Sequence, residues 1–192
     1  MSTRTGPRTG PGPRDRLLDA AQRLTYQQGV GVGVDALLKE ANVARRSLYE
    51  HFGGKDGLVA EVLRRSADED EAAYVRTMSA AGDDPRKRLL AVFDELGRIT
   101  AAPDFRGCRY LAADLALADP EHPGRAVTRA YRERVTGLFE GELVRLGHPR
   151  PARAATQLLV LVDGVLAVGA TRPDADPADA ARELAEGILS EV

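Results

Sequence analysis

Apolar residues recur every three or four positions along most of the chain, which is the spacing of helices with one buried face. Asp84-Pro85 opens one such segment with the polar cap and first-turn proline that start many helices. The inner face expected for this helix comprises Leu89, Leu90, Val92, Phe93 and Leu96. No segment keeps the apolar–polar alternation of a β-strand, so the pattern predicts an all-α protein of about nine helices.

Breaks in the pattern set the expected bounds of these helices. Gly29 follows a first helix, expected over residues 14–28, as glycine often does at a helix C-terminus. Residues 1–13 are rich in Gly, Pro and Thr and are expected to be disordered. Beyond residue 54 the first two expected helices span about 55–80 and from 85 to a break at 101–107. A short apolar helix runs through 111–115 and is followed by a loop at 119–124. The last three helices are expected at 125–146, 152–171 and 177–191.

The stretch from Val34 to Leu58 predicts two short helices joined by a tight turn. The turn begins at Asn42, one of the few residues other than glycine that tolerate the left-handed conformation. In the second helix Leu48 and Phe52 face inward, and the outward face is polar: Arg45, Arg46, Ser47, Tyr49, Glu50 and His51. This layout is a helix-turn-helix, whose second helix can enter the major groove of DNA.

At these residues the chain resembles the TetR family of bacterial transcriptional regulators. The resemblance covers residues from about 14 to 63, and its most specific mark is the Leu-Tyr-x-His-Phe-x-x-Lys string from Leu48 to Lys55. The other matching runs are Ala20-Ala21…Leu24…Gly29, Val34-Asp35…Leu37, Ala41-Asn42-Val43 and Leu58. A looser resemblance continues through Phe105–Tyr110, Asp119–Pro123 and Leu161–Gly164.

The resemblance implies a DNA-binding regulator with an N-terminal helix-turn-helix head of three helices. It divides the chain into a basic tail at 1–13, a DNA-binding domain at 14–54, and a helical ligand-binding and dimerisation domain at 55–192. The expected function is that of a repressor that a small-molecule ligand releases from a palindromic operator. The chain departs from the family at Ala44, where Ser or Thr usually caps the recognition helix, a loss of about 1 kcal/mol.

The expected DNA contacts lie on the recognition helix and on both sides of it. An arginine that bonds a guanine edge through two hydrogen bonds gives about 1–3 kcal/mol of discrimination. The resemblance implies phosphate contacts for Tyr49 and Lys55. The expected DNA-binding residues are Gly33, Arg45, Arg46, Ser47, Tyr49, His51 and Lys55. The alternative for the two arginines is a solvated helix face. Arg4, Arg8, Arg14 and Arg16 either extend the basic footprint or belong to an idle, solvated tail.

Charge is divided unevenly along the chain. Residues 1–55 hold nine Lys and Arg against five Asp and Glu, whereas residues 56–192 hold eighteen against twenty-four. A basic end on an acidic body suits phosphate binding at that end alone, and chance unevenness is the alternative. The division favours double-stranded DNA as the partner.

The segment 152–171 is apolar almost all round, so it needs partners on more than one side. The resemblance implies that this helix and the last one pair with their copies in a homodimer. The expected interface residues are Leu158, Val162, Val165, Leu166 and Gly169. The alternative is that this helix forms the central core of a monomer. A twofold dimer presents two heads to successive major grooves, which predicts a palindromic operator.

The middle of the chain is the expected sensor for a small-molecule ligand that the sequence does not identify. A mostly apolar cavity with a few polar groups is the usual form of such a site. The expected lining is Phe93, Leu96, Phe105, Cys108, Tyr110, Asp114, Tyr131 and Leu138. For each of these residues the alternative is ordinary helix packing, and Cys108 has the further alternative of a thiol sensor.

Enzymatic, metal-binding and membrane functions find little support in the sequence. The three histidines are widely spaced, and no metal-ligand spacing, nucleophile elbow or phosphate-binding loop is present, so neither an enzyme nor a cofactor is expected. No run of eighteen apolar residues, no secretory signal and a single cysteine together predict a cytoplasmic protein without a membrane span. The alternative functions are a helical small-molecule-binding protein that has lost specific DNA binding and an all-α enzyme.

Overall fold

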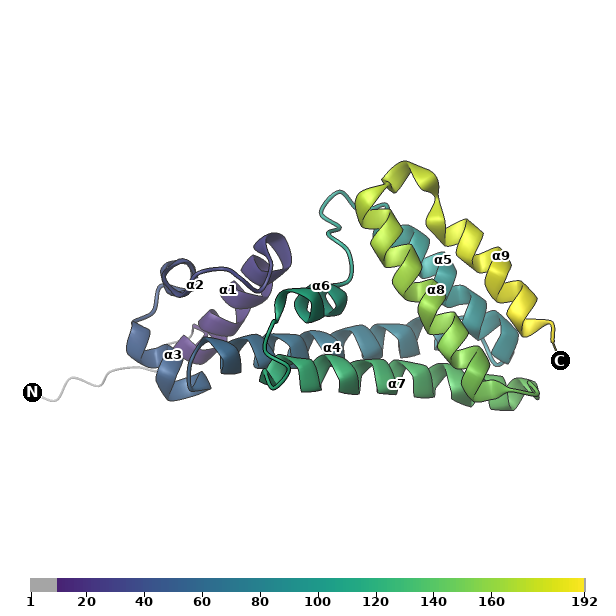
Figure 1. Ribbon diagram of the computed structural model, residues 1–192, viewed down its shortest axis with the longest axis horizontal. Helices are drawn as coiled ribbons and strands as arrows, with labels where there is room; N and C mark the ends of the chain where they lie inside the picture. Colours follow the sequence, from purple (N-terminus) through teal and green to yellow (C-terminus); the bar gives the residue numbers. More distant parts are fainter. Residues whose placement is uncertain (1–9, 192) are drawn as a thin grey trace, which may run out of the picture.

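The computed structural model describes residues 10–191, and within them all regular structure is helical (Figure 1). The prediction of an all-α fold with about nine helices is confirmed. Residues 1–9, which include Arg4, Arg8 and most of the expected tail, lie outside the described residues. The helices are α1 (Pro13–Gln28), α2 (Val34–Ala41), α3 (Arg45–Phe52), α4 (Lys55–Ala80), α5 (Pro85–Thr100), α6 (Arg109–Ala116), α7 (Pro123–Leu146), α8 (Pro151–Thr171), the short 3₁₀ helix η1 (Pro173–Ala175) and α9 (Pro177–Leu189).

Local start signals explain where these helices begin. The Asp84 side chain accepts hydrogen bonds from the backbone N–H groups of Arg86 and Lys87, as its place before Pro85 predicts. Helix α7 begins at Pro123, two residues before its expected start, because the His122 imidazole accepts a hydrogen bond from the Gly124 N–H at 3.0 Å. The expected loop at 119–124 is therefore shorter by its last two residues.

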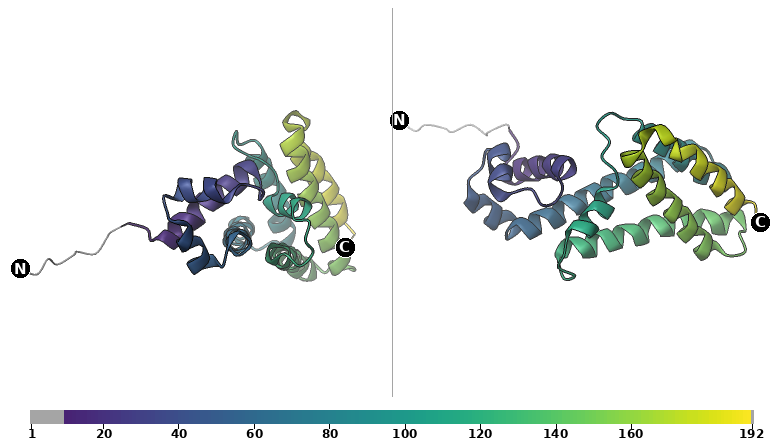
Figure 2. Two further views of the ribbon diagram at one scale, coloured as in Figure 1. Left: turned by 60° about the vertical axis from the view of Figure 1, so that its left-hand side comes forward. Right: turned by 45° about the horizontal axis from the view of Figure 1, so that its top comes forward.

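The molecule is elongated, with α1, α2 and α3 gathered into a head at one end. The long helices α4 and α7 lie side by side along the body, and α5, α8 and α9 pack together at the far end (Figures 1 and 2). The head has its own core, to which α4 contributes Leu58 and Val62. Since α4 begins in the head and continues through the body, one continuous helix joins the two regions.

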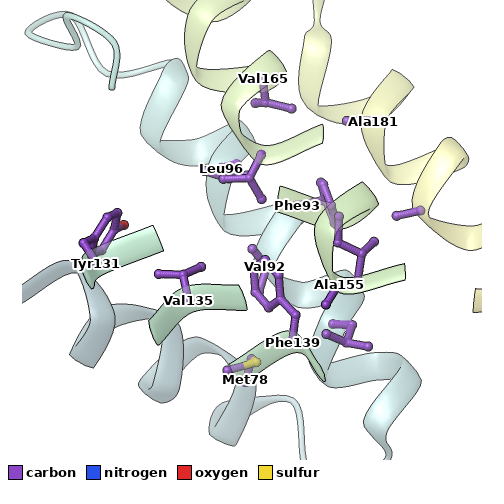
Figure 3. Packing of buried hydrophobic residues seen from close by; sticks show 14 of the residues in the cluster. Met78, Val92, Phe93, Leu96, Tyr131, Val135, Phe139, Ala155, Val165 and Ala181 are labelled. Atoms are coloured by element: carbon purple, nitrogen blue, oxygen red, sulfur yellow. The ribbon is translucent and has the colours of Figure 1, made fainter. Parts of the chain in front are cut away.

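The larger core lies in the body, where side chains from α4, α5, α7, α8 and α9 point toward one another (Figure 3). The predicted inner face of α5 is confirmed: all five of its residues are buried. Phe93 and Phe139 are among the largest fully buried side chains. Burial of such a side chain contributes about 1.5–3 kcal/mol, which makes this core the main source of stability of the body.

Helix α8 is, among the described residues, long and apolar enough to cross a membrane by length and composition alone. The helix also contains the charged residues Arg153 and Asp163, so it holds no run of eighteen apolar residues, as expected from the sequence. Its apolar side chains Leu158, Val162 and Val165 pack into the core of the body instead. Because core helices of soluble proteins pass the same test, α8 is weak support for a membrane span.

Candidate nucleic-acid interface and internal cavity

The turn of the helix-turn-helix has the geometry that its sequence predicts. Asn42 ends α2 in the left-handed region at φ 50° and ψ 55°, and its backbone N–H bonds the carbonyls of Leu38 and Lys39. Ala44 precedes α3 with extended backbone and offers no side-chain cap. Leu48 is the one fully buried residue of α3, so a single side chain supplies most of its hold on the head core.

The outer face of α3 presents polar side chains to solvent. Tyr49 is 57% exposed, and the Arg46 side chain is 85% exposed. The expected DNA-binding residues Gly33, Arg45 and His51 are also exposed, whereas Ser47 and Lys55 are half-buried. The fold thus brings the ends of α2, α3 and α4 together in one strip of the head.

Both arginines of α3 form ion pairs within the head. Arg45 donates from a terminal nitrogen to Oδ1 of Asp35 at 2.6 Å, and Arg46 donates from Nε to Oε1 of Glu50 at 2.5 Å. Exposed pairs of this kind contribute about 0–1 kcal/mol. The two pairs therefore orient the guanidinium groups but hold them only weakly.

Arg14 and Arg16, which were expected in a basic footprint or an idle tail, make contacts that join the helices of the head. Arg14 donates to Oε1 of Glu61 at 2.6 Å and lies over the ring of Phe52, 5.6 Å from its centre. Arg16 donates from Nε to the carbonyl oxygen of Ala41 at 3.2 Å, at the C-terminus of α2. These contacts join α1 to α2, α3 and α4.

An internal cavity of about 120 Å³ lies where the head meets the body. Five of the eight residues expected in a sensor cavity line it: Leu96, Phe105, Cys108, Tyr110 and Tyr131. An apolar cavity of about 150 Å³ can hold a molecule the size of benzene, so this one suits a small ligand.

The other three expected residues lie elsewhere. Phe93 turns into the main core and is 2% exposed, and Leu138 packs against that core from outside. Asp114 lies in a surface groove, where it accepts hydrogen bonds from Thr128 at 2.6 Å and Arg132 at 2.5 Å. Helical periodicity indicates which residues tend to face inward, but not which interior space each one reaches or whether it reaches one.

Sequence reasoning missed several residues of the lining. Tyr26 comes from α1 of the head, Asp70 and Tyr74 from α4, and Asp163 from α8. Four of the five tyrosines of the chain therefore line one cavity, together with Phe105. Tyr110 and Tyr131 stack with ring centres 3.9 Å apart. The concentration of tyrosines is a signal that only the three-dimensional arrangement reveals.

The acidic and phenolic groups of the cavity are desolvated. Burial raises the pKa of Asp70, although Arg109 and the hydroxyl of Tyr110, which donates to Asp70 at 2.6 Å, act in the opposite direction. Burial likewise raises the pKa of Asp163, and Arg132 opposes this shift. The pKa values of all three buried tyrosines, Tyr74, Tyr110 and Tyr131, are raised by burial, so their hydroxyls stay neutral and can donate hydrogen bonds.

The cavity wall contacts the head directly. The Tyr26 hydroxyl accepts a hydrogen bond from the backbone N–H of Arg106 at 3.0 Å, and the Arg109 guanidinium lies 4.7 Å from the centre of the Tyr26 ring. Arg109 also donates to the Ser66 hydroxyl at 2.9 Å, and that hydroxyl accepts from Gln22 of α1 at 3.1 Å. Residues at the start of α6 are therefore connected to α1 through Tyr26 and through the Ser66 hydroxyl.

The residues predicted for the dimer interface face the interior of their own chain. Leu158, Val162 and Val165 are 1–2% exposed, and Leu166 lines the cavity. A Cβ atom added to Gly169 meets Cγ2 of Thr100 at 2.7 Å, so this glycine allows α5 and α8 of one protomer to approach. Most of the predicted interface residues are therefore enclosed in their own chain, which leaves little of their surface for a second copy.

A different set of apolar side chains is available at the surface of α8 and α9. Val160 of α8 is 65% exposed and Leu184 of α9 is 60% exposed. Gly164 and Gly187, on the same two helices, are also exposed, with open space at the position of a Cβ atom. The two helices pack on each other, so both offer exposed apolar or small residues in the same region of the body.

Comparisons with known proteins bear on both regions. The family described as "Bacterial regulatory proteins, tetR family" matches residues 17–62. The HTH-type transcriptional regulator LmrA of Bacillus subtilis is 29% identical over 171 residues, covering 85% of this chain and 89% of that protein. The HTH-type transcriptional regulator BetI of Burkholderia mallei is 28% identical over 184 residues, covering 93% and 92%.

Solved structures extend the similarity over nearly the whole chain. A putative TetR transcriptional regulator from Streptomyces avermitilis is 37% identical with a TM-score of 0.77, covering 92% of this chain and 99% of that one. A TetR-family transcriptional regulator from Streptomyces coelicolor is 30% identical with a TM-score of 0.81, covering 94% and 95%. The similarity therefore includes the body as well as the head.

Proposed function

Because this chain belongs to the TetR family of bacterial transcriptional regulators, which bind DNA as dimers and are not enzymes, we propose that it is a homodimeric repressor released from a palindromic operator by a small ligand. The observation that carries this proposal is the cavity, which has Tyr26 of the DNA-binding head in its wall. Such regulators are typically cytoplasmic, and we propose that location here.

In the proposed complex, α3 enters the major groove. Arg45, Arg46, Ser47 and Tyr49 face the DNA, while Gly33, His51 and Lys55 lie beside the backbone phosphates. The amides at the N-terminus of α4 add a favourable site for an anion next to Lys55. Phosphate contacts supply affinity for any duplex, and base contacts supply the choice of sequence.

The proposed dimer pairs the exposed surface of α8 and α9 with its copy. Val160 and Leu184 supply the apolar contacts, and Gly164 lets the helices approach closely. A twofold axis through this surface gives two heads, hence an inverted repeat in the operator. Burial of exposed valine and leucine side chains favours association by about 25 cal/mol per Å² of apolar surface.

Ligand release follows from the position of Tyr26. A molecule in the cavity contacts the Tyr26 ring and Arg109, and thereby displaces the contacts of α1 with Arg106 and Ser66. The heads then leave the spacing that matches two major grooves. A ligand that binds this conformation more tightly shifts the population away from DNA by its difference in affinity.

Selection of bound duplexes from a random pool, at two salt concentrations, tests DNA recognition. We expect the selected duplexes to contain an inverted repeat. We also expect the affinity to fall steeply as salt rises, because the protein displaces counterions from the phosphates when it binds. Binding that is weak and independent of sequence at both salt concentrations would instead support a small-molecule-binding protein without specific DNA recognition.

A large side chain inside the cavity tests release without an identified ligand. Ala73→Phe places a ring in the lining, and Ala72→Phe places the same ring on the exposed side of α4 as a matched control. We expect A73F to weaken operator binding at least about 10-fold, a change of about 1.4 kcal/mol, while both variants keep their mass and helicity. Equal operator binding by A73F and A72F would contradict control of the heads by the cavity.

A further inference from the structure

We infer that Arg46 reads a guanine in each half-site and that Glu50 is the positioning residue that holds its guanidinium for this contact. The inference rests on the proposed function and adds to it the base that is read. It also separates the two neighbouring arginines of α3, giving Arg45 a phosphate contact in place of a base contact.

The two arginines use different nitrogens in their ion pairs. Arg46 donates to Glu50 from Nε, at a spacing of four residues along the same helix. Arg45 donates from the terminal nitrogen Nη2 to Asp35 at the start of α2. The pair with Glu50 therefore leaves both terminal nitrogens of Arg46 available, whereas the pair with Asp35 occupies one of those of Arg45.

Guanine offers two adjacent acceptors, O6 and N7, in the major groove, and the two terminal nitrogens of an arginine match them. Arg46 can form both bonds while Nε stays on Glu50. Arg45 already donates one N–H of a terminal nitrogen to Asp35, so it has fewer free donors for the same pair of bonds. Arg46 is also the more exposed of the two, with 85% of its side chain accessible against 54% for Arg45.

The charges of α3 oppose what helix stability favours. Two arginines lie in the first turn, where the helix dipole favours acidic residues, and Glu50 lies in the last turn, where it favours basic ones. A pair with the basic residue N-terminal to the acidic one is also the weaker orientation. Local rules broken on an exposed helix face are often a mark of function, because another order of the same charges would stabilise the helix more.

Glu50 carries a second consequence for specificity. A carboxylate on the face that meets DNA repels phosphates and so weakens binding to every duplex. Where Arg46 finds its guanine, the Glu50–Arg46 pair is retained and the base contact offsets the repulsion. Glu50 therefore raises the ratio of specific to non-specific binding in two ways.

The test is a set of full-length variants in the same duplex selection, followed by titration against the selected operator and a random duplex. R46A is expected to lose the preference for guanine at one position of each half-site, by about 10-fold or more. R45A is expected to weaken both duplexes by the same factor. E50A is expected to tighten the random duplex and to reduce the preference at the position that R46A affects.

The variant E50Q distinguishes the positioning of Arg46 by Glu50 from the effect of the Glu50 charge. Its amide oxygen still accepts from Nε of Arg46, so we expect the guanine preference to be kept while binding to random duplex tightens as in E50A. Glu40→Gln removes a charge from α2, where Glu40 pairs with Arg23, and serves as the matched control with unchanged preference. A purely structural role for Glu50 would lower binding to both duplexes together.

Three outcomes would overturn the inference. One is a guanine preference that R45A removes and R46A keeps. Another is a preference that E50A alters at a different position from R46A, which would make Glu50 a direct reader of cytosine. An operator recovered equally by the parent, R46A and E50A would overturn this inference alone, whereas failure of the parent to select any operator would overturn the proposed function with it.

Discussion

The head and the body of this protein place their functional side chains in opposite environments. Arg45, Arg46 and Tyr49 of the head are exposed, and the two arginines are held by weak ion pairs. Tyr110 of the body is buried and Asp70 is half-buried in the wall of a cavity, where burial raises their pKa values. Exposed charges suit a partner as large and polar as DNA, and a desolvated cavity suits a small ligand.

The two regions also differ in how firmly they are built. The core of the body draws on six helices, α4 to α9, while Leu48 is the one fully buried residue of α3 in the head. A region with few buried contacts opens or shifts at lower free-energy cost than a large core. The difference explains how a change in the body can move the head without unfolding the protein.

Leu48→Ala is expected to have the largest effect on this comparison. Removal of a fully buried leucine costs about 2–5 kcal/mol, which the small core of the head cannot absorb. We expect specific DNA binding to be lost while the body stays folded and dimeric, as measured by operator titration, circular dichroism and mass in solution. Leu24→Ala, at a half-buried position of the same core, is the milder control. Collapse of the whole molecule in L48A would show that head and body are not separable.

Val160→Asp tests the surface of the body that we assign to the dimer. The charge is expected to halve the mass in solution and to weaken operator binding about 100-fold, because two linked heads bind far more tightly than one. Val162→Asp, two residues along, is expected to unfold the body because Val162 is 2% exposed within its own chain. A dimer of unchanged mass in V160D would reject this surface.

Asp163→Asn probes the desolvated charge of the cavity through pH. Because burial raises the pKa of Asp163 in the folded chain above its ordinary value of 3.8, the folded state binds a proton more readily than the unfolded state. The free energy of unfolding therefore falls as pH rises through the raised pKa, and the penalty persists at neutral pH. D163N lacks this penalty, so it is expected to be the more stable protein near pH ~7 and to lose its advantage as pH approaches 3.8.

Urea unfolding of parent and variant across that pH range measures the effect. Arg132 is expected to keep its hydrogen bond to Asp114 at 2.5 Å in D163N, while its 3.9 Å ion pair with Asp163 is lost together with the charge. Asp174→Asn, at an exposed position of η1, is the control with a pH-independent difference from the parent. Parallel pH curves for the parent and D163N would mean that Asp163 is not desolvated.

Cys108 gives the smallest expected effect, on reactivity alone. Burial raises the pKa of its thiol above the ordinary 9.0, and the Sγ atom accepts a hydrogen bond from the Leu111 N–H at 3.5 Å. Since the thiolate is the nucleophile, alkylation by iodoacetamide in the native protein is expected to be about 10-fold slower than that of a free thiol. The control is the unfolded protein in urea, in which Cys108 is expected to be alkylated at the same rate as a free thiol. A native rate above that of the free thiol would favour the alternative of a thiol sensor.

The sequence could predict most of the fold because its signals are local. The helix bounds follow from apolar periodicity and from caps such as Asp84, whose hydrogen bonds join residues two or three positions apart. The turn at Asn42 and the exposed face of α3 were predictable for the same reason, since a short helix on one buried leucine has one possible outer face. Contacts within a few residues are encoded where they occur.

The cavity and the dimer surface could not be predicted in the same way. The periodicity of α5 and α8 marks Phe93 and Val162 as apolar, but which space they face depends on where α4, α7 and α9 lie. Tyr26 is separated from Arg106 by 80 positions in the chain, and no local pattern indicates their hydrogen bond.

By itself, then, the sequence determined an all-α chain with a helix-turn-helix and a basic end, because backbone conformation and net charge are properties of short segments. Only the tertiary structure decided that Tyr26 of the head lines the cavity. It also decided that Leu158 is buried while Val160 is exposed to solvent. The physical reason is that burial is a property of the packed helices together, and each helix offers several apolar faces from which packing chooses.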